Sequence, residues 1–177
     1  MSFTIRKLIL VTLRSTLGSA GALAAEQAHF EHFSTRDGAA LKDGDRLFRF
    51  AGIHAPELHR IEDDARGTCK ADPRGWGQYF KWPTAEEQEN WIKALVQTGA
   101  KAQRVYVLSV QQENDAACGR ETHILSPETP DSMPRLNEAA MKVYDNMIAE
   151  ADKQGLRLIL PFIDHWWWWG GREQLAA

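Results

Sequence analysis

The spacing of apolar residues along the chain changes between a period of two and a period near 3.6. Two segments near the N-terminus, 32–41 (HFSTRDGAAL) and 42–53 (KDGDRLFRFAGI), each carry an Asp-Gly pair beside a short β run. Asp-Gly favours the tight turns of β-hairpins. The first segment is therefore predicted to form a hairpin, and the second a turn followed by a strand. Five apolar residues make that strand suitable for burial: Leu47, Phe48, Phe50, Ala51 and Ile53.

Helical spacing begins after residue 83. Thr84 followed by Glu87 is the pattern of a capping box, so a helix is predicted to start there. Its apolar face would consist of Trp91, Ile92 and Leu95. Gly99 is predicted to end the helix.

A second helix is predicted from Asn137 to Gly155. Leu136 and Met141 stand at the positions of a hydrophobic staple around its start. The predicted buried stripe is formed by residues at helical spacing, namely Met141, Tyr144, Ile148 and Ala151.

Strands are predicted on the C-terminal side of each helix. Segment 101–110 (KAQRVYVLSV) is rich in β-branched and aromatic residues, and segment 156–163 (LRLILPFI) is almost continuously apolar. Such a run is typical of a parallel strand covered on both faces. The order of elements is therefore a βα repeat.

The lengths of the connections refine this prediction. Long loops follow the strands, at 54–83 and 111–136, whereas short turns follow the helices. This asymmetry is typical of a (β/α)8 barrel, whose site is built from the loops after its strands. A doubly wound sheet shares part of the pattern, but no Gly-rich phosphate-binding fingerprint follows any strand. We therefore predict an α/β fold, a partial (β/α)8 TIM barrel of about three βα units preceded by a short β-hairpin.

Composition and the N-terminus limit the function classes. The chain has 177 residues, a net charge of -3 and 44% hydrophobic residues, which fits one globular domain and argues against a nucleic-acid partner.

Residues 1–25 read as a signal peptide, with Arg6 and Lys7 before an apolar run and small residues at 21–25. An uncleaved amphipathic helix is the alternative. The prediction is a secreted or periplasmic domain at 26–177, with no membrane partner after signal cleavage.

Cys69 and Cys118 are predicted to form a disulfide. An even number of cysteines in an exported protein favours pairing. Both cysteines fall in loops that follow strands, and parallel neighbouring strands place such loops at the same end of a sheet. Two free thiols are the alternative.

Candidate binding residues gather where the predicted strands end. His54 and Glu57 follow the first strand, Arg104 and Tyr106 lie in the second, and Asp164 and His165 follow the third. An Arg inside an apolar strand, if buried, needs an anionic partner. Alternation places Arg104 on one face with Ala102, Tyr106 and Leu108; an ordinary ion pair is the alternative to a substrate contact. His54, Glu57 and His59 lack the spacing of a metal motif, so neither metal nor cofactor is predicted.

Four consecutive tryptophans occupy positions 166–169. An indole ring packs well on the C–H face of a pyranose while its N–H bonds a hydroxyl group. Trp166 and Trp168 are therefore candidate sugar contacts. The alternative is that some of the four merely cover the core.

Three segments together resemble the first βα units of clan-A glycoside hydrolases, closest to the mannanase- and cellulase-like branch. They are DGAALKDGDRLFRFAGIHAPEL, WPTAEEQENWIKALVQTGAKAQRVYVLSV and GLRLILPFIDHWWWWGG, and the similarity spans about residues 30 to 177. Arg104 matches the Arg of that family's second strand, whereas His54 stands where the family often has Asn.

The resemblance implies a retaining glycosidase acting on a β-linked polysaccharide such as mannan, with two catalytic Glu residues about 5–5.5 Å apart. The family places these after the fourth and seventh strands, so both are expected beyond residue 177. A whole barrel takes about 250 residues, and this chain is expected to be its N-terminal portion, with a missing C-terminal barrel portion as a partner. The alternatives are a non-catalytic carbohydrate-binding remnant and an inactive truncation product.

Overall fold

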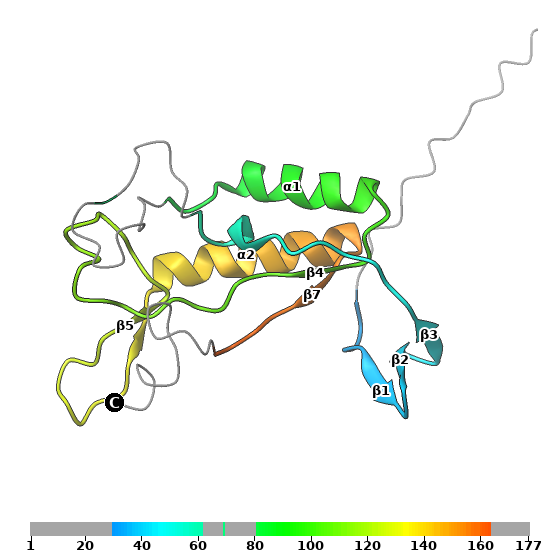
Figure 1. Cartoon of the computed structure of the whole chain (residues 1–177), viewed down its shortest axis with the longest axis horizontal. Coiled ribbons are helices and arrows are strands. Elements are labelled where there is room, and N and C mark those ends of the chain that lie inside the picture. The colour runs from blue at the N-terminus through cyan, green and yellow to red at the C-terminus, as the bar shows by residue number, and fades with distance from the viewer. Residues whose placement is uncertain (1–29, 62–68, 70–80, 164–177) are drawn as a thin grey trace, which may run out of the picture.

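The computed structural model describes residues 30–61, 69 and 81–163, which form a mixed α/β fold (Figure 1). It contains a three-stranded antiparallel meander, one parallel pair of strands, a small antiparallel pair and two α-helices. The predicted signal peptide at 1–25 lies outside the described residues, as do Asp164, His165, Trp166 and Trp168.

The meander consists of β1 (Thr35–Asp37), β2 (Ala40–Asp43) and β3 (Arg46–Phe48). Thr35 pairs with Lys42 and Leu41 pairs with Phe48. Gly38 and Gly44 both have φ +59°, the left-handed conformation that these tight turns require. The two predicted Asp-Gly turns are confirmed.

The strand predicted with Leu47, Phe48, Phe50, Ala51 and Ile53 is regular only over β3, and it is largely exposed. Leu47 is 55% exposed and Ile53 is 57% exposed. The segment nevertheless runs beside the next strand, because Lys101 donates its backbone N–H to Ala51 O (3.3 Å). Gly52 permits this approach, since a Cβ there would lie 1.9 Å from the carbonyl oxygen of Ala102. The burial prediction was wrong because apolar composition alone does not supply a second layer over that face.

Helix α1 (Ala85–Gln97) starts as predicted, with both hydrogen bonds of the Thr84–Glu87 capping box. It ends at Thr98, and Gly99 has φ +85°. Ile92 and Leu95 are buried, but Trp91 is 46% exposed, so the predicted apolar face was partly wrong. The polar residue Gln88 takes the place of Trp91 on the buried face.

Helix α2 (Glu138–Gln154) is capped by the Asn137 side chain, which accepts from the N–H groups of Ala139 and Ala140, and it ends at Gly155 with φ 73°. Tyr144 and Ala151 are buried as predicted. Met147 is buried in place of Ile148, which is 38% exposed. The buried stripe therefore keeps Tyr144 and Ala151 from the prediction and adds Ala140 and Met147.

The parallel strands are β4 (Ala102–Arg104) and β7 (Arg157–Ile159), paired in register from Ala102 with Arg157 to Arg104 with Ile159. The predicted parallel arrangement is confirmed, but both regular strands are shorter than predicted. The loop between 111 and 136 also contains an unpredicted antiparallel pair, β5 (Ile124–Leu125) and β6 (Arg135–Leu136).

Helices α1 and α2 lie side by side over one face of the parallel pair (Figure 1). The core lies between them and the strands, and its fully buried side chains include Leu58, Ile92, Val105, Met147 and Leu156.

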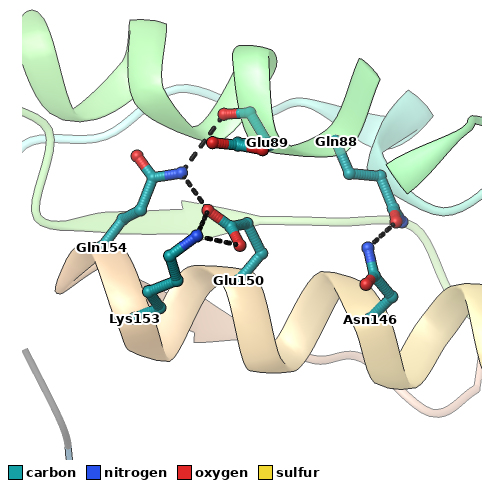
Figure 2. A network of polar contacts seen from close by, with 6 residues as sticks. All are labelled: Gln88, Glu89, Asn146, Glu150, Lys153 and Gln154. Carbon is teal, nitrogen blue, oxygen red and sulfur yellow. Dashed lines mark hydrogen bonds and ion pairs between the residues drawn. The ribbon is translucent and has the colours of Figure 1, made fainter. Parts of the chain in front are cut away.

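Polar contacts join the same two helices (Figure 2). Asn146 donates to the Gln88 side chain (2.6 Å), and Gln154 donates to the carbonyl oxygen of Glu89 (3.2 Å) and to Glu150. The helices are thus held by apolar packing and by specific hydrogen bonds at two separate points.

The meander attaches at the amino ends of β4 and β7. Arg157 reaches it by donating to His32 O (2.6 Å) and pairing with Asp43. Phe30 donates its backbone N–H to Asp152 (2.7 Å). A largely apolar cavity of about 730 Å³ lies between the meander, α2 and β7. The candidate site lies at the opposite end, where β4 and β7 have their carboxyl ends.

Candidate functional site

Three of the predicted binding residues meet at the carboxyl end of β4. Along this strand and its extension the side chains alternate: Gln103 and Val105 are buried, whereas Arg104 and Tyr106 are exposed. Alternation is the rule for a strand, so Arg104 and Tyr106 share one face. His54 joins them from the preceding segment through a parallel bridge with Arg104. We call His54, Arg104 and Tyr106 the site trio.

The hydrogen bonds of His54 determine its tautomer. Its Nδ1 lies 3.0 Å from the carbonyl oxygen of Arg104. A carbonyl oxygen can only accept, so Nδ1 carries the proton. Nε2 is then free to accept from the Arg104 guanidinium, whose Nη1 lies 3.3 Å away. The slightly longer contact of Nη1 with Nδ1 joins two donors and is not a hydrogen bond.

Tyr106 completes the site trio through ring contact. Its ring centroid lies 5.1 Å from that of His54, with the planes at 68°. This edge-to-face geometry is a favoured one for aromatic pairs. The trio therefore presents a cation, an imidazole and a phenol together on the exposed face of the sheet.

The structure corrects one expectation for Arg104. The sequence places it inside an apolar strand, where a buried guanidinium would need an anionic partner. The side chain is instead exposed, and its contact is with the His54 ring. An exposed guanidinium is not desolvated and needs no anionic partner.

Glu57 occupies a different place from the trio. It lies in the single-turn helix η1 (Pro56–Leu58) and is half-buried. Within the described part of the chain it makes none of the contacts that join His54, Arg104 and Tyr106. Its predicted role as a substrate contact stays a prediction, as do those of Asp164, His165, Trp166 and Trp168.

A buried histidine pair lies directly behind the trio, and the sequence analysis missed it. His59 and His123 are both fully buried, and their rings are joined from Nδ1 to Nε2 at 3.1 Å. His59 Nε2 lies 2.9 Å from the carbonyl oxygen of Tyr106, and His123 Nδ1 lies 2.9 Å from Ser109 Oγ. The two histidines are 64 residues apart, and no spacing motif links them.

Burial keeps both rings neutral. It lowers the pKa of His59 to about 4, with the Tyr106 carbonyl acting in the opposite direction and the charge of Arg60 adding to the decrease. Burial also lowers the pKa of His123 to about 2, helped by His59 and Arg60. At neutral pH the pair therefore acts as a hydrogen-bonding unit without charge.

Aromatic side chains enclose the pair. Tyr144 of α2 lies 5.1 Å from the His59 ring, and Trp82 lies 5.1 Å from the His123 ring. Burial raises the pKa of Tyr144 to about 12. Trp82 is held from outside by a hydrogen bond from its Nε1 to Glu121 (2.7 Å).

A disulfide joins the two long loops that also carry His59 and His123. Cys69 and Cys118 are linked with an S–S distance of 2.08 Å, and both are buried. They are the two cysteines that the sequence analysis pairs. In the same loop as Cys118, Asp115 and Arg120 form a buried ion pair at 3.6 Å. Covalent and ionic contacts thus fix the loop that carries His123.

Among residues 30–61, 69 and 81–163, no group of three or more His, Cys, Asp or Glu side chains is arranged to hold a metal ion. Across the same described residues, no helix has the length and apolar character needed to cross a membrane.

The fold and the sequence were compared with those of known proteins. No protein-family model and no curated protein matches the sequence. Among solved structures, the fold is similar to that of the endo-1,4-beta-mannanase from Rhizomucor miehei, with a TM-score of 0.56 and 13% sequence identity. The match covers 80% of this chain and 32% of the mannanase, so the chain spans about a third of that enzyme. At this identity the likeness shows similarity of fold alone.

Proposed function

We propose that this chain is the N-terminal part of a (β/α)8 barrel of the glycoside hydrolase lineage. In this proposal it supplies one side of a cleft for a β-linked polysaccharide such as mannan. The observation that carries the proposal is the place of the site trio. It lies at the carboxyl end of a parallel strand, in a fold shared with an endo-1,4-beta-mannanase. Barrel enzymes build their active sites at that end of their strands.

The chemistry of the trio suits a sugar. The face of the Tyr106 ring can pack against pyranose C–H groups, and its hydroxyl can bond a sugar hydroxyl. Arg104 offers several N–H donors in a fixed plane. The His54 ring orients both, because it is fixed to the Arg104 carbonyl and touches Tyr106. Glu57, Asp164, His165, Trp166 and Trp168 are proposed as further contacts.

Hydrolysis itself is proposed to need groups outside this chain. A retaining glycosidase uses two carboxyl groups about 5–5.5 Å apart, one as acid/base and one as nucleophile. In the proposed barrel these belong to later strands, and Arg104 would steady the nucleophile. The chain alone is therefore expected to bind mannan without cleaving it.

Export is part of the same proposal. A disulfide persists in an oxidising compartment such as the periplasm or the extracellular space. The Cys69–Cys118 pair and the predicted signal at 1–25 both fit a secreted or periplasmic protein. In such a compartment the protein would encounter polymeric plant mannan.

The test is electrophoresis of the purified chain in gels containing soluble 1,4-β-mannan, with dextran gels as the control for an α-linked polymer. We expect retardation in mannan, none in dextran, and no release of reducing ends. The variant His54→Ala/Arg104→Ala/Tyr106→Ala should lose the retardation. A matched variant at exposed residues elsewhere, Phe33→Ala/Lys93→Ala, should keep it. Equal mobility of the wild-type chain in both polymers would refute the proposal.

A further inference from the structure

Hydrogen-bond polarity runs in one direction through the buried histidine pair. The Tyr106 carbonyl oxygen can only accept, so His59 carries its proton on Nε2 and leaves Nδ1 as an acceptor. His123 must then donate from Nε2 to His59 Nδ1. This leaves His123 Nδ1 to accept from the hydroxyl and the backbone N–H of Ser109, at 2.9 and 3.2 Å. Every donor in this series of four hydrogen-bonded residues therefore meets an acceptor.

Both ends of the chain of hydrogen bonds attach to the strand that carries the site. Tyr106 and Ser109 are three residues apart, and the two histidines come from two different loops. Tyr106 touches His54 on the exposed face through its ring while its carbonyl oxygen bonds His59 on the buried side. The backbone of the site strand is thus held from behind at two points.

We infer that Ser109, His123 and His59 form a positioning relay for the site trio, and that the relay holds only while both imidazoles are neutral. This inference rests on the proposed function and adds acid sensitivity to it. Protonating either ring turns an acceptor into a donor. If His59 is protonated, its Nδ1–H faces the Nε2–H of His123. If His123 is protonated, its Nδ1–H faces the backbone N–H of Ser109. The first event breaks the bond between the rings and displaces His59, whose Nε2–H still holds the Tyr106 carbonyl oxygen. The second event frees Ser109 from the relay.

Few charged groups face the relay. Arg60 follows His59 directly, and its positive charge opposes protonation of both rings. α2 contributes only the phenol of Tyr144, and the segment before α1 contributes the indole of Trp82, bonded to Glu121. The loop of His123 adds the ion pair of Asp115 and Arg120. Within the described residues, the rings therefore have aromatic walls and a cationic neighbour.

The first measurement is nitrogen-15 NMR of the histidine rings in the full chain from pH 8 to pH 3. We expect His59 and His123 to carry their protons on Nε2 and neither ring to titrate near the ordinary value of 6.5. The Tyr106 amide signal should move together with the first protonation. An Nδ1–H tautomer in either ring, or titration near 6.5, would overturn the relay.

The variant Ser109→Ala tests the same idea with the loss of one oxygen atom. Without the hydroxyl, the neutral form of His123 loses a donor to its lone pair, so the ring protonates more easily. The acid midpoint of the His123 ring signals, followed below pH 3, should rise by about 0.7 pH unit, the equivalent of one neutral hydrogen bond. Thr98→Ala, which removes a hydroxyl bond to Leu95 O at the end of α1, is the control. A midpoint shift no larger than that of Thr98→Ala would contradict the inference.

Mannan affinity separates this inference from the proposed function. Ser109→Ala should weaken mannan binding about fivefold at the pH where its His123 ring is protonated and the wild-type His123 ring is not. At pH 8 the two proteins should bind alike. A wild-type chain that shows the expected ring tautomers but no mannan binding at any pH would refute the function and leave the relay standing. Mannan binding whose pH profile is the same in both proteins would refute the positioning role alone.

Discussion

The imidazole of His54 donates from Nδ1 to the backbone carbonyl oxygen of Arg104 across 3.0 Å. A side chain from one segment is thereby fixed to the backbone of its parallel neighbour. Because the same ring accepts from the Arg104 side chain and touches Tyr106, one register between two segments determines all three positions. The consequences can be tested residue by residue.

Tyr106 should contribute to mannan binding through its ring. We expect Tyr106→Ala to weaken binding by about 1 kcal/mol, roughly fivefold, because the aromatic surface is lost. Tyr106→Phe keeps the ring and should weaken binding less. Isothermal titration with a soluble mannan measures both. If the two variants bind as tightly as the wild type, the ring makes no sugar contact.

The capping box of α1 should be a measurable source of stability. Thr84→Ala removes the acceptor for the Glu87 N–H (3.1 Å) and should lower the free energy of unfolding by about 1 kcal/mol. Thr84→Ser keeps the oxygen atom and serves as the control. Urea denaturation followed by circular dichroism gives both values, and equal stability of the two variants would be the contrary result.

Truncating the Gln88 side chain should lower the free energy of unfolding, because the side chain is buried and all its polar atoms are hydrogen-bonded. Its amide donates to the carbonyl oxygens of Leu58 (2.7 Å) and Val143 (3.0 Å), and its oxygen accepts from Asn146 (Figure 2). Gln88→Ala leaves these groups unpaired and should cost about 2–4 kcal/mol. The exposed Gln97→Ala in the same helix should change stability by less than about 0.5 kcal/mol. Similar losses in the two variants would mean that the bridge contributes nothing specific.

Reducing the Cys69–Cys118 disulfide should destabilise the chain. The two cysteines are 49 residues apart, and a cross-link over such a loop contributes about 2–4 kcal/mol. Thermal unfolding with and without dithiothreitol should show a lower midpoint for the reduced protein. The variant Cys69→Ser/Cys118→Ser should match the reduced protein and be unaffected by the reductant. An unchanged midpoint on reduction would contradict this role.

The neutral burial of His59 and His123 should make stability depend on pH. Both pKa values are lower in the folded chain, to about 4 and about 2, than the ordinary 6.5. The unfolded chain therefore takes up protons first, and stability is complete above pH 6.5. It should fall between pH 6.5 and pH 4, with a slope approaching about 1.4 kcal/mol per pH unit for each histidine. Urea denaturation at several pH values measures this slope, and a variant His123→Gln should show about half of it. A flat profile between pH 6.5 and pH 4 would count against neutral burial.

Local signals in the sequence predicted the elements well. The Asp-Gly turns, the Thr84 capping box and the Asn137 and Gly155 ends of α2 depend on residues within a few positions of each other. Such short-range chemistry is visible in the sequence. The parallel pairing of β4 and β7 also followed from the order of elements.

Long-range packing was predicted less well. Trp91 and Ile53 are apolar by composition yet exposed, because burial depends on what covers a face. For the same reason Met147 rather than Ile148 lies in the core. The pair of His59 and His123 joins two loops whose meeting no local pattern encodes. Of the site, the contact among His54, Arg104 and Tyr106 agrees with their predicted places at the strand ends.

An NMR titration of the full chain with a 1,4-β-linked mannooligosaccharide at pH 7 tests sugar binding at the site trio most directly. We expect saturable shifts that are largest at His54, Arg104 and Tyr106, at the carboxyl end of β4. The apolar cavity beside the meander, lined by Phe48 and Ile148 among others, should be unaffected. Absence of shifts at the site trio, or shifts confined to that cavity, would contradict the proposal that the trio binds mannan.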